Sequence, residues 1–306
     1  MKLNSDMEGI SIQAICKSYP LKKGKQDALK KIELAIPEGE LFGLIGPDGA
    51  GKTTLFRILT TLLLPDSGNA TVNGWDVQKD FLQIRKEVGY MPGRFSLYTD
   101  LTVEENLNFF ANIFNTTVKE NYHLIKEVYK MIEPFKNVRA GKLSGGMKQK
   151  LALSCALIHK PKTLFLDEPT TGVDAVSRKE FWELLRSLKE EGITIMVSTP
   201  YMDEASLCDR VGLIQKGNIM GVDTPAGLRQ SFGNKLLAMK SGNMLSLLRQ
   251  LQSLPEVEHA YPFGEKHHVV LKPGAGIPSL QSDIEIEEVN PDIEDCFISL
   301  MRTHAG

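Results

Sequence analysis

A short apolar run, followed at once by a glycine-rich stretch and then by a helical pattern, constrains this chain more than any other feature. Residues 41–45 read LFGLI, which is typical of a strand buried on both faces in a parallel sheet. Beyond the glycines, Leu55, Ile58, Leu59 and Leu62 recur at helical spacing. The sequence therefore predicts a sharp turn from a buried strand into a helix, which is the setting of a phosphate-binding loop.

The turn supplies the chemistry that phosphate needs. Glycines let backbone N–H groups close around phosphate oxygens, and the start of the following helix adds a favourable partial charge. We expect Lys52 to contact the outer phosphates of a nucleotide and Thr53 to offer its hydroxyl to Mg²⁺. A chance glycine-rich turn is the alternative, and the flanking strand and helix argue against it. The predicted loop consists of Gly46, Pro47, Asp48, Gly49, Ala50, Gly51, Lys52, Thr53 and Thr54.

A second candidate anion site lies at the start of another predicted helix. Its residues are Ser144, Gly145, Gly146 and Met147. Leu151 and Cys155 continue the helical pattern, so the serine and the two glycines stand where backbone N–H groups can receive an anion. An ordinary serine cap is the alternative, because serine is common at helix starts. This stretch alone does not decide between the two.

A pair of carboxylates closes another predicted buried strand. Residues 163–167 read TLFLD, and Glu168 and Pro169 follow. Side chains at the carboxyl end of a parallel strand lie at the ligand-binding edge of such a sheet. Asp167 would hold the same Mg²⁺ as Thr53, and Glu168 would orient or deprotonate a water molecule. The alternative is an acidic strand end that leads into a turn, and the upstream phosphate loop favours the catalytic interpretation.

The alternation of strands and helices predicts two domains. Most of residues 1–232 form an α/β pattern, which indicates a doubly wound parallel sheet with an antiparallel β piece. Between about residues 95 and 160 the strand signals disappear, and Val103 and Leu107 begin a helical pattern that predicts a helical insertion. Residues 233–306 predict a small α+β domain without a chemical motif.

Charge and composition exclude several classes of partner. The 306 residues carry a net charge of −2 and no long basic run, so we expect no nucleic-acid partner. The four cysteines stand singly, and His267 and His268 should point to opposite faces of a strand, so no metal cluster is predicted. Residues 1–6 lack the apolar core of a signal peptide, and no apolar run could span a bilayer. We expect a cytoplasmic protein whose membrane part, if any, is another chain.

The phosphate loop, the serine-glycine stretch and the carboxylate pair occur in an order that resembles the ATP-binding cassette (ABC) ATPases over residues 9 to about 230. Leu143 to Met147 looks like the signature that separates this family from other P-loop proteins. The resemblance implies ATP and Mg²⁺, and two cassettes packed head to tail. Ser144 and Gly146 would then face the phosphates held by Lys52 of the other cassette. It also implies that Tyr19 stacks on adenine and that Asp174 belongs to the D-loop at the dimer interface.

The stretch from Gly89 to Leu107 and the C-terminal domain resemble the ATPases that pair with ABC-2 type export permeases. We therefore expect a peripheral protein on the cytoplasmic face of the cell membrane, bound through such a permease and driving export as an Mg-dependent ATPase. A homodimer is favoured, and a heterodimer with a different cassette is the alternative. Residues 93–98 are expected to form part of the permease dock, although clustered loop apolars more often pack inward.

Two positions depart from the family pattern. Gly93 stands where the Q-loop glutamine is usual, and Pro200 stands where the H-loop histidine is usual. Neither residue supplies a side-chain hydrogen bond. Slow hydrolysis by a regulatory clamp, or by a degenerate half of a cassette pair, is therefore an alternative to efficient turnover. A soluble ABC protein acting on ribosomes or DNA is a third and less favoured one, since the chain has one cassette and no basic arm.

Overall fold

The computed structural model describes residues 8–22, 24–278, 280 and 284–303; residues 1–6, on which the expectation about a signal peptide rests, lie outside this range. The chain forms two compact units, Met1–Pro225 and Ala226–Gly306. The second unit begins before residue 233, the start predicted for the small domain. Among the helices that the structure describes, none is long and apolar enough to cross a membrane.

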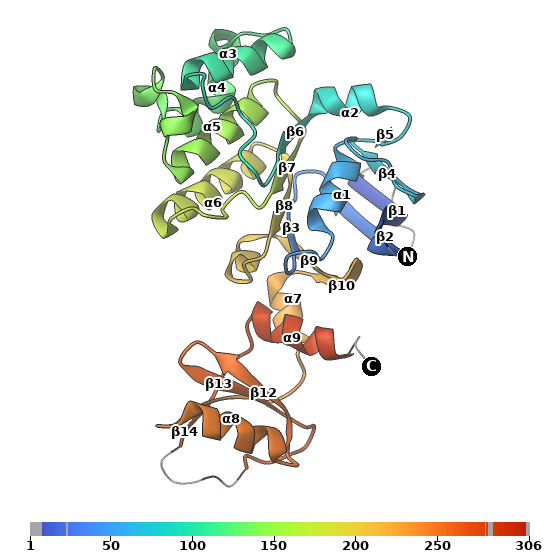
Figure 1. Cartoon of the computed structure of the whole chain (residues 1–306), viewed down its shortest axis with the longest axis vertical. Coiled ribbons are helices and arrows are strands. Elements are labelled where there is room, and N and C mark those ends of the chain that lie inside the picture. The colour runs from blue at the N-terminus through green and yellow to red at the C-terminus, as the bar shows by residue number, and fades with distance from the viewer. Residues whose placement is uncertain (1–7, 23, 279, 281–283, 304–306) are drawn as a thin grey trace. The chain divides into compact units, whose positions relative to one another are not determined.

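A mostly parallel sheet forms the centre of the first unit (Figure 1). In spatial order its strands are β10 (Asn218–Asp223), β9 (Arg210–Gln215), β3 (Leu41–Ile45), β8 (Thr194–Thr199), β7 (Thr163–Asp167) and β6 (Val88–Met91). The pairs within β9-β3-β8-β7-β6 are parallel, and β10 joins the edge antiparallel. Every residue of β3, β7 and β8 is buried, as the unbroken apolar runs predict for strands covered on both faces.

An antiparallel sheet packs on one side of this core. Its strands, in order, are β2 (Lys25–Pro37), β1 (Glu8–Pro20), β4 (Ser67–Val72) and β5 (Trp75–Asp76). Strand β2 is not among the predicted elements. Its buried Leu29 and Ile32 are three residues apart, because the β1–β2 register shifts there and Lys31 has a left-handed backbone (φ 51°). A bulge of this kind interrupts the alternation of apolar and polar residues by which a strand is recognised in a sequence.

Helices cover the parallel sheet and form the predicted insertion. They are α1 (Lys52–Leu59), α2 (Phe81–Glu87), α3 (Val103–Ile113), α4 (Val118–Tyr129), α5 (Gly145–Leu157) and α6 (Ala175–Glu190), with the short three-ten helices η2 (Glu133–Phe135), η3 (Ala140–Lys142) and η4 (Asp203–Leu207). In Figure 1, α3, α4 and α5 gather away from α1 and the antiparallel strands. Val103 and Leu107 are buried, whereas Ile113, the last residue of α3, is exposed.

The second unit is an antiparallel sheet with helices on both faces. Its elements are α7 (Pro225–Gln230), β11 (Leu236–Lys240), α8 (Met244–Ser253), β12 (Val257–Phe263), β13 (Lys266–Leu271), β14 (Glu285–Glu288) and α9 (Ile293–Thr303), with strand order β12-β13-β11-β14. His267 Nε2 lies 2.7 Å from Met244 O of α8, and His268 Nδ1 lies 2.7 Å from Asp295 Oδ1 of α9. The two histidines therefore point to opposite faces, as predicted.

Candidate functional site

The turn between β3 and α1 has the geometry that its glycines predict. Gly51 adopts φ 113°, a conformation that other residues rarely take, and a Cβ there would lie 2.5 Å from Ala28 O. A Cβ on Gly46 would lie 2.1 Å from Ile214 O. The loop therefore depends on glycine for both backbone conformation and close approach to the neighbouring strands.

The side chain of Lys52, the first residue of α1, lies inside the loop. It is 3% exposed, and its Nζ donates to Gly46 O at 2.7 Å and to Pro47 O at 3.2 Å. Glu168 Oε1 lies 3.1 Å from the same nitrogen. Buried charges require partners of this kind. The predicted phosphate-binding cation and the predicted catalytic carboxylate are thus in direct contact.

A cavity of about 230 Å³ opens over this pair. Its described lining joins most of the predicted loop to Tyr19 and Glu168, and consists of Tyr19, Gln26, Ala28, Gly49, Ala50, Gly51, Lys52, Thr53, Thr54 and Glu168. The Tyr19 hydroxyl lies 3.3 Å from Thr54 Oγ1. Tyr19 of the antiparallel sheet therefore lies beside the loop. No local sequence pattern predicts this contact, because Tyr19 and the loop are far apart in the chain.

Asp167 and Glu168 are held by Ser198 at the end of the neighbouring strand β8. Ser198 Oγ donates to Asp167 Oδ1 at 2.6 Å and accepts from Glu168 N at 3.0 Å. Glu168 has φ 51°, and a non-glycine residue in such a sparsely populated conformation costs about 1–3 kcal/mol. Burial, followed by the charge of Asp167, raises the pKa of Tyr90 on β6 to about 12.

The oxygen atoms near the cavity suit a hard divalent cation such as Mg²⁺. The donors are the Thr53 hydroxyl, which lines the cavity, and the Asp167 carboxylate, which is 2% exposed. Among the described residues, no group of three or more His, Cys, Asp and Glu could hold a metal ion. Mg²⁺ commonly takes only one or two protein ligands and completes its shell with phosphate oxygens and water. The donor set therefore fits a cation that arrives with a nucleotide.

The second candidate anion site lies on α5 and takes no part in the cavity. Ser144 caps this helix by accepting from Met147 N at 3.3 Å. A Cβ on Gly146 would lie 2.5 Å from Ser177 Oγ, so the stretch packs against the start of α6. None of residues 144–147 is among the described residues that line the cavity.

Asp174, predicted to belong to the D-loop, caps α6. Its Oδ1 accepts from Ser177 N at 3.0 Å, and this backbone hydrogen bond lowers the pKa of the carboxyl. Because Ser177 also contacts Gly146, the predicted signature and the predicted D-loop form one local cluster. The structure therefore groups these two stretches together, apart from the loop of Gly46 to Thr54.

Of the two departures from the family pattern, Gly93 lies beside Asp167, and Pro200 follows the last residue of β8. A Cβ on Gly93 would lie 3.1 Å from Asp167 O and 3.8 Å from Asp167 Oδ2. Pro200 follows Thr199, whose hydroxyl donates to Glu204 Oε2 at 2.6 Å and accepts from Tyr201 N at 3.0 Å. The Thr199 hydroxyl is therefore engaged in hydrogen bonds within the protein.

Comparison with known proteins decides the family. A family model described as ABC transporter matches residues 29–171. The linearmycin resistance ATP-binding protein LnrL of Bacillus subtilis (strain 168) is 34% identical over 298 residues, which cover 90% of this chain and 94% of that protein. The chain belongs to the ABC transporter ATP-binding proteins. The resemblance inferred from the motifs is confirmed.

Two further relatives define the extent of the likeness. The probable multidrug ABC transporter ATP-binding protein YbhF of Escherichia coli (strain K12) is 42% identical over 285 residues, covering 90% of this cassette and 49% of that protein. The cassette thus spans about half the length of YbhF. The dimeric ATP-binding cassette MJ0796 in a post-hydrolysis state with ADP and Pi is 26% identical, with a TM-score of 0.64, covering 70% of this chain and 98% of that one. The predicted fold class is confirmed.

Two residues of the site escaped the sequence interpretation. Ser198 lies at the end of the buried strand β8, and its position at the same sheet edge as Asp167 was the available signal. Glu204, in η4, is 2% exposed and accepts hydrogen bonds from Thr170 and Thr199. No local pattern distinguishes it from the exposed acidic residues of the chain.

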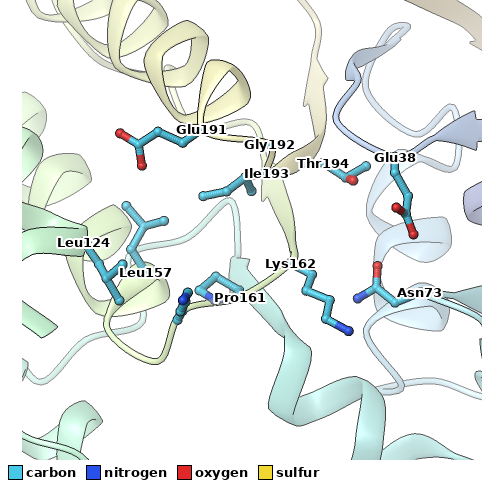
Figure 2. A pocket seen from close by; sticks show the side chains of 11 residues that line it. Glu38, Asn73, Leu124, Leu157, Pro161, Lys162, Glu191, Gly192, Ile193 and Thr194 are labelled. Carbon is cyan, nitrogen blue, oxygen red and sulfur yellow. The ribbon is translucent and has the colours of Figure 1, made fainter.

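A pocket of about 280 Å³ lies at the opposite ends of the strands, where Thr163 and Thr194 begin β7 and β8 (Figure 2). Figure 2 shows Glu38, Asn73 and Lys162 on one side of it and Leu124 on the other. Its described lining contains no predicted site residue. Ligands of open α/β sheets bind at the carboxyl ends of the strands, which is the edge where the cavity above Lys52 lies.

Proposed function

We propose that this cassette binds Mg-ATP, forms a head-to-tail dimer around it, and hydrolyses it to drive export through a separate ABC-2 type permease on the cytoplasmic face of the cell membrane. One observation carries the proposal. The cavity contains one phosphate-binding loop, while the second anion site, Ser144 to Met147, lies outside it. Two copies related by a twofold axis would bring each loop opposite the other copy's signature.

In each site the loop would bind the ATP phosphates through its backbone N–H groups, and Lys52 would exchange its contact with Glu168 for the γ-phosphate. Tyr19, which lines the same cavity, would stack on the adenine. Thr53 and Asp167 would hold Mg²⁺, which neutralises charge on the phosphates when it is bound.

Glu168 would position the attacking water and accept its proton as the bond to the γ-phosphorus forms. The bond between the γ-phosphorus and the β–γ bridging oxygen then breaks, leaving ADP and inorganic phosphate. Glu168 Oε1 lies 3.1 Å from the nitrogen of the cation expected to bind the γ-phosphate, and this proximity supports the role.

The dimer is tested by light scattering with and without Mg-ATP. Ser144→Asp keeps an oxygen that can cap α5 but sets a negative charge opposite the partner's phosphates, so we expect it to abolish the ATP-dependent dimer while the monomer still binds ATP. Asn243→Asp is the matched control, because Asn243 caps α8 through Ser246 N and lies in the other unit. A wild-type monomer in every nucleotide state would contradict a homodimer and favour a partner of different sequence.

The permease dock is supported by an apolar groove of about 470 Å³ between the sheet and the helical insertion. Ser96 and Leu97 line it together with Phe110 and Ile113, and Ile113 is 54% exposed. A cytoplasmic helix of the permease with apolar side chains fits such a surface. Leu97 itself is buried, whereas Tyr98 is exposed and its ring contacts Phe109 at 4.8 Å between centroids.

The Ser96→Cys variant, treated with a thiol crosslinker in the assembled transporter, should become linked to a cytoplasmic loop of the permease. Ser206→Cys, on an exposed position outside the groove, is the control. A complex that crosslinks equally well from both positions, or from neither, would refute the dock. Export as the direction of transport is supported by the two relatives whose names refer to multidrug transport and to linearmycin resistance.

A second candidate is a clamp that closes on ATP and hydrolyses it slowly. It is favoured by Gly93 and Pro200, since neither offers a side-chain hydrogen bond beside Asp167 or the end of β8. Single-turnover measurement of ATP cleavage by the cassette with its permease separates the two. ATP cleavage as fast as transport supports the ATPase that drives export. ATP cleavage much slower than transport supports the clamp, or a heterodimer in which the partner cassette supplies the active site.

A further inference from the structure

Glu204 is a buried carboxylate that the proposed mechanism does not use, and it lies next to the end of β8 and the turn after Glu168. Glu204 belongs to η4 and is 2% exposed. Burying a carboxylate is costly unless hydrogen bonds and positive charge compensate it. The partners of Glu204 therefore indicate what holds it there.

Both carboxylate oxygens accept hydrogen bonds from buried threonines. Thr170 Oγ1 donates to Oε1 at 2.8 Å, and Thr199 Oγ1 donates to Oε2 at 2.6 Å. Thr170 lies in the turn that follows Glu168, and Thr199 is the last residue of β8. One side chain thus joins the turn of the predicted catalytic residue to the end of the neighbouring strand.

The turn needs such support because Glu168 has a left-handed backbone, with φ 51°. Residues in sparsely populated conformations persist only where the surrounding structure over-determines them. Ser198 O and Oγ, each 3.0 Å from Glu168 N, hold one end of the turn. Glu204 holds the other end through Thr170.

Arg178 of α6 supplies the positive charge. Its Nη1 lies 4.0 Å from Glu204 Oε1 and 3.8 Å from Asp203 Oδ2, and its guanidinium lies 5.1 Å from the centroid of the Tyr201 ring. The helix that Asp174 caps is therefore tied to the same carboxylate. Glu204 connects the turn after β7, the end of β8 and the first turns of α6.

We propose that Glu204 is a positioning residue for Glu168. Acting through Thr170 and Thr199, it holds the turn so that the Glu168 carboxylate stays opposite Lys52, in a cassette that has Gly93 and Pro200 where polar side chains are usual. This inference rests on the hydrolytic role of Glu168 proposed above.

The test compares Thr170→Val, Thr170→Ser and Glu204→Gln in ATP hydrolysis by the full chain with its permease. We expect kcat to fall about 10- to 100-fold in Thr170→Val, since small misplacements of reacting groups cost factors of this size. The KM for ATP should stay within about twofold, because the loop that binds phosphate is untouched. Thr170→Ser, which keeps the hydroxyl, should restore turnover.

Thr163→Val is the matched control. Thr163 is also buried, begins the same strand β7, and donates its hydroxyl to Asn73 Oδ1 at 2.7 Å, far from the site at the opposite strand end. The Thr163→Val variant should lose about as much thermal stability as Thr170→Val but keep the wild-type kcat. If Thr170→Val does not fold, Glu204→Gln carries the same expectation, because it keeps the side-chain size and one acceptor.

Repeating the measurements in a Glu168→Gln background distinguishes positioning of Glu168 from a purely structural role of Glu204 and Thr170. There Thr170→Val should not lower the residual turnover further, because the group it positions is gone. Equal losses in both backgrounds, an unchanged kcat in Thr170→Val, or a KM that rises as much as kcat falls would each overturn the inference. A wild-type cassette that cleaves no ATP with its permease would instead contradict the proposed function, and this is seen before any variant is made.

Discussion

The predicted phosphate loop and the segment from Ser198 to Glu204, which begins in β8, both contact the carboxylate pair of Asp167 and Glu168 but are built in different ways. In the loop from Gly46 to Thr54, backbone groups and glycine conformations create the surface, and they follow directly from consecutive residues. In the segment from Ser198 to Glu204, side chains of separate elements make the contacts, with Asp167, Thr170 and Arg178 as partners. The comparison teaches that the proposed binding half of the site is local in the chain, whereas the half proposed to position Glu168 is assembled by the fold.

The largest effect is expected at Glu168, where the two regions meet. Glu168→Gln removes the only proton acceptor that contacts Lys52 among the described side chains. We expect hydrolysis to fall by about 10²–10⁴, the range of a positioned general base, while ATP binding is retained and the ATP-bound dimer accumulates. Phosphate release and light scattering measure the two effects. Glu183→Gln on the exposed side of α6 is the control, and a Glu168→Gln variant that turns over normally would show that the catalytic group lies elsewhere.

Removing the charge of the local half should produce the next largest effect. Lys52→Ala takes away the cation that the loop carbonyls and Glu168 surround. A charge-assisted hydrogen bond contributes about 1.5–3 kcal/mol, so ATP affinity should fall by about one to two decades. Titration calorimetry measures it, with Lys79→Ala on the exposed surface as control. An unchanged affinity would mean that the loop does not bind the phosphates.

Restoring the family's polar groups at Gly93, after β6, and at Pro200, after β8, should produce a smaller gain. A Cβ at Gly93 would lie 3.8 Å from Asp167 Oδ2, and its 3.1 Å approach to Asp167 O requires only a slight shift. We expect Gly93→Gln with Pro200→His to raise turnover about tenfold, below the usual range for an optimally placed group, and to leave ATP affinity nearly unchanged. Gly93→Ala controls for the added bulk, and Glu168→Gln should stay inactive in this background. If the double variant is no faster than wild type, the two departures are harmless.

The smallest expected effect concerns Asp66, which holds the end of β1 just before Tyr19. Asp66 accepts from Lys17 Nζ at 2.7 Å and from Ser18 N at 2.7 Å, and these contacts lower the pKa of Asp66 to about 2. Its folded-state pKa is therefore below the unfolded value of about 3.9. The stabilisation is present above pH 4 and is lost as the pH falls towards 2.

Asp66→Asn should thus lower the thermal midpoint slightly at neutral pH, and its difference from wild type should shrink as the pH falls from about 4 towards 2. Calorimetric scans over that range measure it, with Asp100→Asn on the exposed surface as control. A difference that grows on acidification would contradict the assigned role of the ionised carboxylate.

The local structure around the candidate site was predicted from sequence because its parts combine a local pattern with a definite chemistry. An apolar run flanked by glycines, lysine and threonine leaves few alternatives to a strand, a turn and a helix start. The same reasoning placed Asp167 and Glu168 at the end of a buried strand, and both lie there. Strand β2 escaped prediction because the bulge near Lys31 interrupts its alternation, which only pairing with β1 explains.

The sequence by itself determined the loop around Lys52 and the buried strands near it, because each depends on residues close together in the chain. It also determined the family, because each of the three motifs is local and their order along the chain can be read without the fold. The tertiary structure decided which distant side chains complete the site. Tyr19 reaches Thr54 from another sheet, Ser198 bonds the Asp167 carboxylate, and Glu204 joins Thr170 to Thr199. Such contacts depend on strand order and register, which bring chain segments together whatever their separation, and a single serine, tyrosine or glutamate carries no local mark of the partner it will meet.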